Sequence, residues 1–203
     1  MKIALFGATG GTGRQVLVRA LRNGDSIRAL VRSPEKLDPA SALEIIPGDV
    51  RDQGAVDRCL EGVDAAVCVL GSHGGREPVE AKGTALIIDG MQRLGVRRLV
   101  AVTSLGVGDS RDQVPGFFRV LMQLTLKKIM AAKEEQEALI RESALDWTIV
   151  RPGGLTDGPA TGAYRSGTDA SIKATRVSRA DVAEFVVQQL SDDRYLRQTP
   201  AIS

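Results

Sequence analysis

The chain has 203 residues, of which 43% are hydrophobic and 26% charged, and its formal net charge is +2. This length allows one α/β domain with a full core but not two, so we expect a single domain over 1–203. Aromatic residues make up only 3% of the chain and no basic tract contains them, which argues against a nucleic-acid partner. No apolar run is long enough to span a membrane and no signal peptide precedes the first expected strand, so we expect a cytoplasmic protein without a membrane partner.

The first fourteen residues have the layout of a dinucleotide-binding turn. An apolar strand runs directly into Gly7, Gly10 and Gly13, and a helix continues over 15–21. The three glycines suit a tight bend, a close approach to pyrophosphate and close helix–sheet packing, and the helix N-terminus favours phosphate. The alternative is a glycine-rich turn that binds nothing. The expected cofactor-binding residues here are Gly7, Thr9, Gly10, Gly11, Thr12, Gly13 and the adjacent Arg14.

Apolar runs and helical periodicity alternate along the rest of the chain. Further strands are expected at 26–31, 43–47, 65–70, 98–103 and 146–150, and helices at 52–60, 79–94, about 117–142 and 179–190. This alternation predicts an α/β fold, a doubly wound parallel sheet (Rossmann fold) with helices on both faces. Residues 151–178 are rich in glycine and are expected to form a flexible lid on the substrate side.

Two cysteines and one histidine bear on metal and redox chemistry. Cys59 falls in an expected helix and Cys68 in an expected strand, and they lack the spacing of metal ligands. We therefore expect reduced thiols in the core and no metal site.

Ligands of doubly wound sheets bind outside the carboxyl ends of the strands. The residues that follow the expected strands are therefore candidates for the site: Arg32, Ser33, Asp49, Val50, Leu70, Gly71, Ser72, His73, Thr103, Ser104, Pro152, Gly153, Gly154 and Leu155.

The end of the second strand bears on the choice of dinucleotide. An acidic residue at this point would bind the 2′-hydroxyl of NAD, whereas an arginine accommodates the 2′-phosphate of NADP. The chain has Arg32 and Ser33 there, and Arg14 is expected within reach of the same phosphate. We therefore predict NADPH in preference to NADH. The alternative is that both arginines are solvated surface charges.

With these residues in view, the chain resembles the atypical short-chain dehydrogenase/reductase family. Within that family it is most similar to the NmrA-like branch and to the biliverdin-IXβ reductase/flavin reductase group. The resemblance runs nearly end to end, and the motifs at 161–164 (Thr-Gly-Ala-Tyr) and 177–181 (Val-Ser-Arg-Ala-Asp) point to the flavin and biliverdin reductases. The other shared motifs lie at 6–13, 30–32, 48–50, 70–72, 103–104, 139–143 and 151–153.

The resemblance assigns roles to the strand-end residues. It implies that Asp49 and Val50 line the adenine, and that residues 70–72 lie along the ribose and pyrophosphate. It also implies that Thr103 and Ser104 border the nicotinamide, with residues 152–155 at its carboxamide. Ser104 corresponds to a serine beside the substrate pocket, for which we expect a positioning hydrogen bond.

Two departures from the family bear on the chemistry. The usual catalytic pair is Tyr-x-x-x-Lys, but Ile129 stands four residues before Lys133. The reductases also often have a histidine where this chain has Gly153. Without a strong acid, reduction of a ketone is disfavoured, because the developing alkoxide needs a proton donor. A conjugated acceptor can delocalise the charge and take a proton from water.

These observations favour an NADPH-dependent oxidoreductase that reduces a flavin, a biliverdin-like tetrapyrrole or a quinone, acting as a monomer or weak homodimer. Ser104 and Lys133 are its candidate catalytic residues. The alternative is a non-catalytic, NmrA-like NADP(H)-binding regulator. Nucleotide-sugar epimerase chemistry is disfavoured because it relies on the missing tyrosine.

Four further residues admit two interpretations each. His73 is either a titrating group near the cleft or a solvated loop residue, and Lys133 either contacts ribose hydroxyls or belongs to a charged helix face. Trp147 is expected in the core rather than as a stacking platform. Tyr164 either covers a planar substrate or lies on a mobile loop.

Overall fold

The computed structural model describes residues 1–72, 77–116 and 126–203. Its strands are β1 (Lys2–Phe6), β2 (Ser26–Val31), β3 (Leu43–Pro47), β4 (Ala65–Cys68), β5 (Arg98–Val102), β6 (Asp146–Pro152), β7 (Gly154–Thr156), β8 (Ser166–Gly167), β9 (Arg176–Ser178) and β10 (Ala201–Ile202). Its helices are α1 (Gly11–Arg22), α2 (Gln53–Leu60), α3 (Glu80–Leu94), α5 (Lys127–Glu142) and α6 (Arg179–Gln188), with 3-10 turns η1 (Pro34–Lys36), η2 (Gly108–Gln113) and η3 (Asp193–Tyr195).

The main sheet confirms the expected doubly wound architecture. Its strand order is β3-β2-β1-β4-β5-β6-β10-β8, and all neighbours are parallel except β10 and β8. The chain begins at the centre of the sheet, extends to β3 and then returns through β4 to the other side. This reversal places a switch point between β1 and β4, where such sheets bind their ligands.

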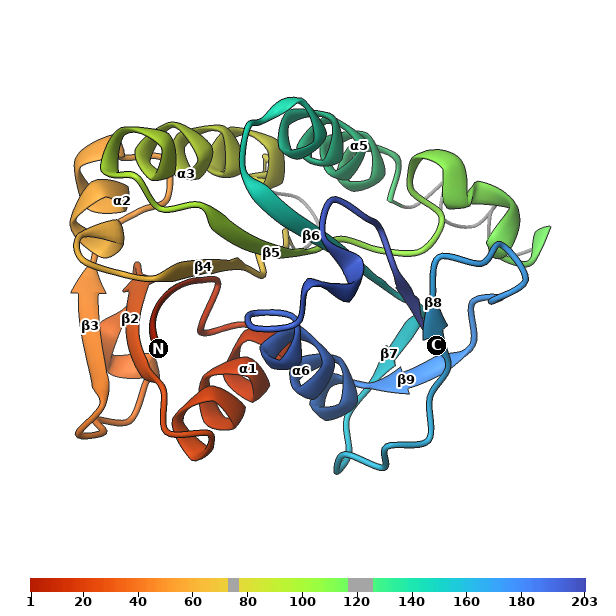
Figure 1. Cartoon of the computed structure of the whole chain (residues 1–203), viewed down its shortest axis with the longest axis horizontal. Helices are drawn as coiled ribbons and strands as arrows, with labels where there is room; N and C mark the ends of the chain where they lie inside the picture. Colours follow the sequence, from red (N-terminus) through yellow and green to blue (C-terminus); the bar gives the residue numbers. More distant parts are fainter. Residues whose placement is uncertain (73–76, 117–125) are drawn as a thin grey trace.

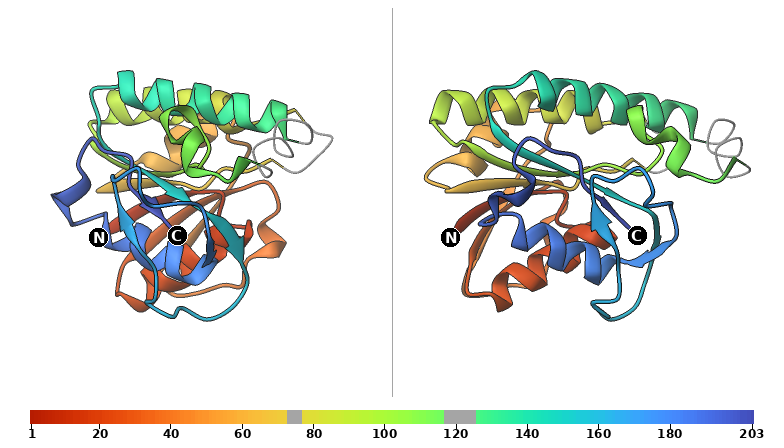
Figure 2. Two further views of the ribbon diagram at one scale, coloured as in Figure 1. Left: turned by 90° about the vertical axis from the view of Figure 1, so that its right-hand side faces the viewer. Right: turned by 45° about the vertical axis from the view of Figure 1, so that its right-hand side comes forward.

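Helices cover both faces of the sheet, with α2, α3 and α5 above it and α1 and α6 below (Figure 1). The alternating side chains of β1 show why both faces need cover. Ile3 and Leu5 pack into the core with α1 and α6, while Ala4 and Phe6 pack into the core with α2, α3 and α5. Figure 2 shows the same three layers from two other sides.

Local signals fix the ends of several helices. The Asp52 side chain accepts from Gly54 N and so caps α2, and Ser178 caps α6 by accepting from Asp181 N. Gly95 ends α3 in the left-handed conformation, with φ of 74°. These residues satisfy backbone groups that helix ends leave unpaired, so the sequence determines the boundaries locally.

The structure differs from the sequence expectations mainly after β6. The segment 151–178 contains β7 and β9, which pair with each other, and β8, which pairs with β10. Two- and three-residue strands lack a periodic pattern, so the sequence did not indicate them. The helix expected over 117–142 is described only from Lys127 onward, and residues 117–125 lie outside the described part. The flexibility of segment 151–178 stays a prediction.

Both cysteines are buried and free, in agreement with the expectation of core thiols. Burial raises the pKa of the Cys59 thiol to about 12 and also raises that of Cys68. Within the described residues, no helix is both long and apolar enough to cross a membrane.

Candidate cofactor and acceptor site

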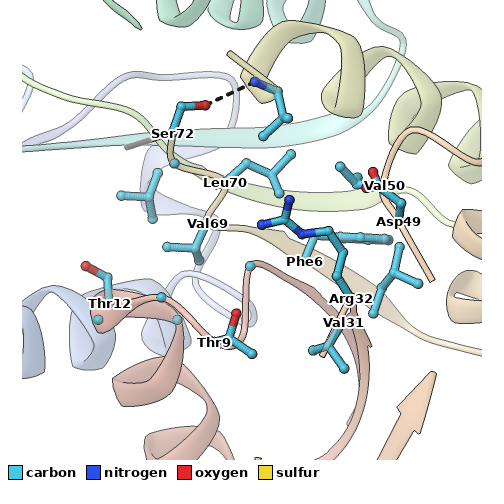
Figure 3. A pocket seen from close by; sticks show the side chains of 18 of the residues that line it. Phe6, Thr9, Thr12, Val31, Arg32, Asp49, Val50, Val69, Leu70 and Ser72 are labelled. Carbon is cyan, nitrogen blue, oxygen red and sulfur yellow. Dashed lines mark hydrogen bonds between the residues drawn. The ribbon is translucent and has the colours of Figure 1, made fainter. Parts of the chain in front are cut away.

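A cleft of about 1120 Å³ lies at the carboxyl ends of the central strands, and we call it the main cleft. Figure 3 shows Thr9 and Thr12 of the glycine turn on one side, Leu70 and Ser72 on another, and the Arg32 side chain pointing into the space. The structure brings together most of the expected site residues there: Gly7, Thr9, Gly10, Gly11, Thr12, Gly13, Arg32, Asp49, Val50, Leu70, Gly71, Ser72, Thr103, Ser104, Lys133 and Leu155.

The glycine turn has no room for side chains at two of its positions. Gly7 has φ of 95°, and a Cβ there would lie 2.3 Å from Val69 O. A Cβ on Gly13 would lie 2.0 Å from Gly7 O. Glycine at these two positions therefore lets the turn pack closely against Val69 and against the start of α1, and Gly11 and Thr12 of the first helical turn line the cleft. No described side chain caps α1 at Gly10, and the first turn has no acidic residue, which leaves the first N–H groups of the helix for an anion.

Basic side chains gather where β2 ends. Arg32 follows β2, and Lys36 in η1 lines the same part of the main cleft. Asp49 lies in the same region. Its carboxylate accepts from Arg51 Nε at 3.0 Å and from Arg51 Nη2 at 2.8 Å. The hydrogen bond from Arg51 is the largest cause that lowers the Asp49 pKa to about 2. This part of the cleft is therefore lined by an ionised carboxylate, Asp49, and by the basic residues Arg32, Lys36 and Arg51.

Five expected cofactor-binding residues do not line the main cleft. Arg14 turns back on the protein and donates to Thr9 O and Lys36 O, at 3.2 and 2.7 Å. It thereby ties the glycine turn to η1, so its role is to position these segments. The expected residues outside the lining are Arg14, Ser33, Pro152, Gly153 and Gly154.

Gly153 is enclosed by the end of the chain. A Cβ on this residue would lie 2.6 Å from Thr175 O and 2.7 Å from Ser203 Oγ. Its N–H donates to Ile202 O of β10 at 2.9 Å. The backbone after β6 therefore packs too tightly for a side chain at residue 153, such as the histidine that the resemblance implies.

The two hydroxyls after β5 border the other end of the cleft, which we call the acceptor end. Thr103 Oγ1 donates to Glu137 Oε1 at 2.7 Å, and Ser104 Oγ donates to Leu105 O at 3.0 Å. Because both hydroxyl protons are directed at protein acceptors, each oxygen can accept a hydrogen bond from a ligand. This geometry suits orientation of a ligand N–H rather than donation of a proton.

A buried ion-pair network supports the acceptor end from behind. Glu137 is 3% exposed and accepts from Arg151 Nε at 3.0 Å and Nη2 at 2.5 Å. Arg151 is also 3% exposed, and its Nη1 lies 2.6 Å from the Asp109 carboxylate. A bidentate pair of this kind restricts the orientations of both side chains. Glu137 can therefore hold the Thr103 hydroxyl in one orientation.

Lys133 of α5 is the cation at the acceptor end. Burial lowers the pKa of its ammonium group, while the charges of Glu80 and Glu137 raise it. Glu80 itself is fully buried and accepts from Ser72 N at 2.8 Å and Ser72 Oγ at 2.6 Å. Lys133 therefore faces the cleft rather than belonging to a wholly solvated helix face, although the sequence pattern allowed both.

Several residues of the cleft were missed from sequence. Lys36 carried a weak signal, since it lies four residues after Arg32 in a turn that begins with Pro34. Arg179 belongs to the Val-Ser-Arg-Ala-Asp motif, but its distance in sequence from the glycine turn concealed its place. The lining residues without a sequence prediction include Lys36, Arg51, Glu77, Val79 and Arg179.

Trp147 and the two tyrosines lie away from the cleft, whereas Phe6 lines it. Trp147 is buried in the core, as expected. Tyr164 packs edge-on against Phe185, with ring centroids 6.1 Å apart. The centroid of the Tyr195 ring lies 5.9 Å from that of Phe185. Neither tyrosine lines the main cleft. His73 lies outside the described residues.

The sequence profile of an NAD(P)H-binding family matches residues 7–193. An uncharacterised chloroplastic protein of Arabidopsis thaliana is 32% identical over 208 residues, which cover 93% of this chain and 71% of that protein. A (4-alkanoyl-5-oxo-2,5-dihydrofuran-3-yl)methyl phosphate reductase of Streptomyces griseus is 32% identical over 153 residues, covering 74% of this chain and 46% of the reductase.

The solved structure of ChuY, described as an anaerobillin reductase from Escherichia coli O157:H7, superposes with a TM-score of 0.83. It is 26% identical in sequence, and the match covers 100% of this chain and 96% of ChuY. The glycine turn without room for side chains, the free helix N-terminus and the basic end of β2 all fit a dinucleotide. The chain therefore belongs to the NAD(P)H-binding family of atypical short-chain dehydrogenases/reductases, and it is an NAD(P)H-dependent oxidoreductase.

Proposed function

We propose that the protein is an NADPH-dependent reductase whose acceptor is a conjugated molecule: a flavin, a biliverdin-like tetrapyrrole or a quinone. The observation that carries this proposal is the position of the tyrosines. The sequence contains two, Tyr164 and Tyr195, and both pack around Phe185 away from the main cleft. A phenol therefore does not reach Ser104, whereas reduction of a simple ketone needs a proton donor at the developing alkoxide.

The names of two similar proteins support reduction as the reaction. One is described as an anaerobillin reductase and the other as a reductase of a dihydrofuranyl methyl phosphate. Both names describe a reductase. We carry this class of reaction, and not either substrate, to the present chain.

The cofactor-binding residues divide by the part of the dinucleotide that each would hold. The glycine turn would bind the pyrophosphate, Asp49 and Val50 the adenine, and residues 70–72 the ribose and pyrophosphate. Arg32 and Lys36 together would bind a 2′-phosphate, which is the basis for proposing NADPH rather than NADH. When bound, NADPH supplies a hydride to the acceptor.

At the acceptor end, the chain orients groups rather than donating a strong acid. The Thr103 and Ser104 oxygens are placed to accept from the carboxamide N–H groups of a nicotinamide. Lys133 adds a positive charge beside them, which stabilises negative charge on a reduced acceptor. The acceptor then takes its proton from the Lys133 ammonium or from water. We also propose that the protein acts as a monomer or weak homodimer.

The test is NADPH oxidation with FMN, riboflavin, biliverdin and quinones offered in turn. We expect turnover with at least one of them, and a KM for NADPH that rises in Arg32→Ala. The matched control is Arg97→Ala, because Arg97 pairs with Asp146 on the surface at the opposite end of the sheet. Tight dinucleotide binding without turnover on any acceptor would overturn the reductase and favour the non-catalytic regulator.

A further inference from the structure

Arg179 brings a positive charge to the start of the first helix from the far end of the sequence. It is the first residue of α6, which lies beside α1 below the sheet (Figure 1). Its side chain lies directly over Gly11, since a Cβ on that glycine would be 2.8 Å from Arg179 Nε and 2.9 Å from Cδ. The two residues therefore meet side chain to backbone.

Both Arg179 and Gly11 line the main cleft. The guanidinium of Arg179 and the uncapped N–H groups of α1 thus present positive charge to the same space. The glycine turn alone accounts for the binding of a phosphate, but it does not explain why an arginine side chain is held there. A pyrophosphate has oxygens for both, because it carries two phosphates and two negative charges.

The ion-pair partner of Arg179 can be given up at little cost. Its Nη1 lies 2.7 Å from Asp157 Oδ1, and the Asp157 side chain is 93% exposed. Exposed pairs of this kind contribute little to stability, because water and salt screen them. Asp157 also follows β7 in the glycine-rich segment 151–178, whose Leu155 lines the cleft.

We propose that Arg179 binds the dinucleotide pyrophosphate and that Asp157 holds its guanidinium only until the dinucleotide arrives. In the free protein the carboxylate neutralises the arginine beside the cleft. On binding, the pyrophosphate replaces Asp157 as the partner of the guanidinium. This inference rests on the dinucleotide binding within the proposed function, but not on the acceptor or on a preference for NADPH.

The simpler explanation is that Arg179 is a spacer whose methylenes cover Gly11. Arg179→Met distinguishes the spacer role from the pyrophosphate contact, because methionine keeps an unbranched apolar stem over Gly11 but removes the charge. Arg179→Lys keeps a charge and loses the fork that binds two oxygens at once.

The experiment measures dissociation constants by calorimetry for NADPH, NADH and ADP-ribose, which all contain the pyrophosphate. Loss of a charge-assisted hydrogen bond should weaken binding of all three by about ten- to a hundredfold in Arg179→Met. Arg179→Lys should lie between this variant and the wild type. Asp157→Asn should tighten binding by about two- to fivefold, because the competing carboxylate is gone. A melting temperature for each variant checks that it is folded.

Wild-type affinity in Arg179→Met would overturn the pyrophosphate contact and leave the spacer explanation. Unchanged or weaker binding in Asp157→Asn would overturn the exchange. Arg32→Ala keeps the proposals distinct, because it should weaken NADPH and leave NADH and ADP-ribose unchanged. If no acceptor is reduced but the Arg179 variants behave as described, the reductase fails while the pyrophosphate contact holds.

Discussion

The two ends of the main cleft are built in different ways. One end, which we call the phosphate end, is built around the glycine turn, where Gly7 and Gly13 let segments approach more closely than a side chain would allow. The acceptor end is made of side chains held by other side chains, as in the chain from Thr103 through Glu137 to Arg151. The glycine turn is thus specified by residues that lie close together in the sequence. The acceptor end, in contrast, exists only after β5, α5 and β6 have packed.

The largest effect should come from adding a methyl group at the phosphate end. In Gly13→Ala the new Cβ would lie 2.0 Å from Gly7 O, so the turn must open. We expect dinucleotide binding to weaken by more than about a hundredfold, as a misplaced backbone loses several hydrogen bonds to phosphate. Calorimetric titration measures this. Gly54→Ala in α2 is the control, because its Cβ meets nothing closer than 3.5 Å and binding should be unchanged. Equal behaviour of the two variants would contradict the close-packed turn.

The next largest effect should appear as lost stability at the acceptor end. Glu137→Ala leaves the buried Arg151 without its bidentate partner, which should lower the free energy of unfolding by about 3–5 kcal/mol. Urea unfolding gives the value. The exposed Glu142 of the same helix serves as the control, and Glu142→Ala should change stability by less than about 0.5 kcal/mol. If Glu137→Ala lowered the free energy of unfolding as little as Glu142→Ala, the ion-pair network would not stabilise the acceptor end.

Arg32→Ala sharpens the comparison within the phosphate end, because Arg32 acts through its side chain. Removing one charge-assisted contact should raise the KM for NADPH about tenfold and leave that for NADH nearly unchanged. Steady-state kinetics with both cofactors measures the ratio. An unchanged KM for NADPH would show that Arg32 is a solvated surface charge.

The smallest effect concerns the charge of Lys133. Burial lowers its pKa, so the ammonium form is lost at a lower pH than in an ordinary lysine. If that charge assists reduction, activity should fall as the pH rises through this lowered pKa. Lys133→Met should be about two- to tenfold slower near neutral pH and should lack that alkaline decline. The same decline in both proteins would assign it to another group.

Much of the fold was predictable because its signals are local. The strands at 26–31 and 43–47 have the predicted bounds, since apolar runs between turn residues set them. The glycine turn was predictable for the same reason: its spacing, strand and helix lie within twenty-two residues. β10 has two residues and pairs with β6 from the end of the chain, so no pattern in its own sequence indicates it.

The candidate site was predictable in part. The strand-end rule found Thr103, Ser104 and Leu70, because parallel strands end at one edge of the sheet. It missed Arg179, which reaches the cleft from a helix rather than a strand. It also included Gly153, which Thr175 and Ser203 enclose although both lie far from it in the sequence. Contacts between distant segments decide such cases, and spacing along the sequence does not contain them.

Transfer of hydride from NADPH to a conjugated acceptor in the main cleft can be tested directly. The measurement is a single-turnover reduction of the best acceptor with NADPH stereospecifically deuterated on either face of the nicotinamide C4. We expect deuterium on one face to slow the reaction and deuterium on the other to leave it unchanged, because the cleft would hold the ring in one orientation. Binding of NADPH without acceptor reduction, or slowing that is the same for both faces, would contradict it.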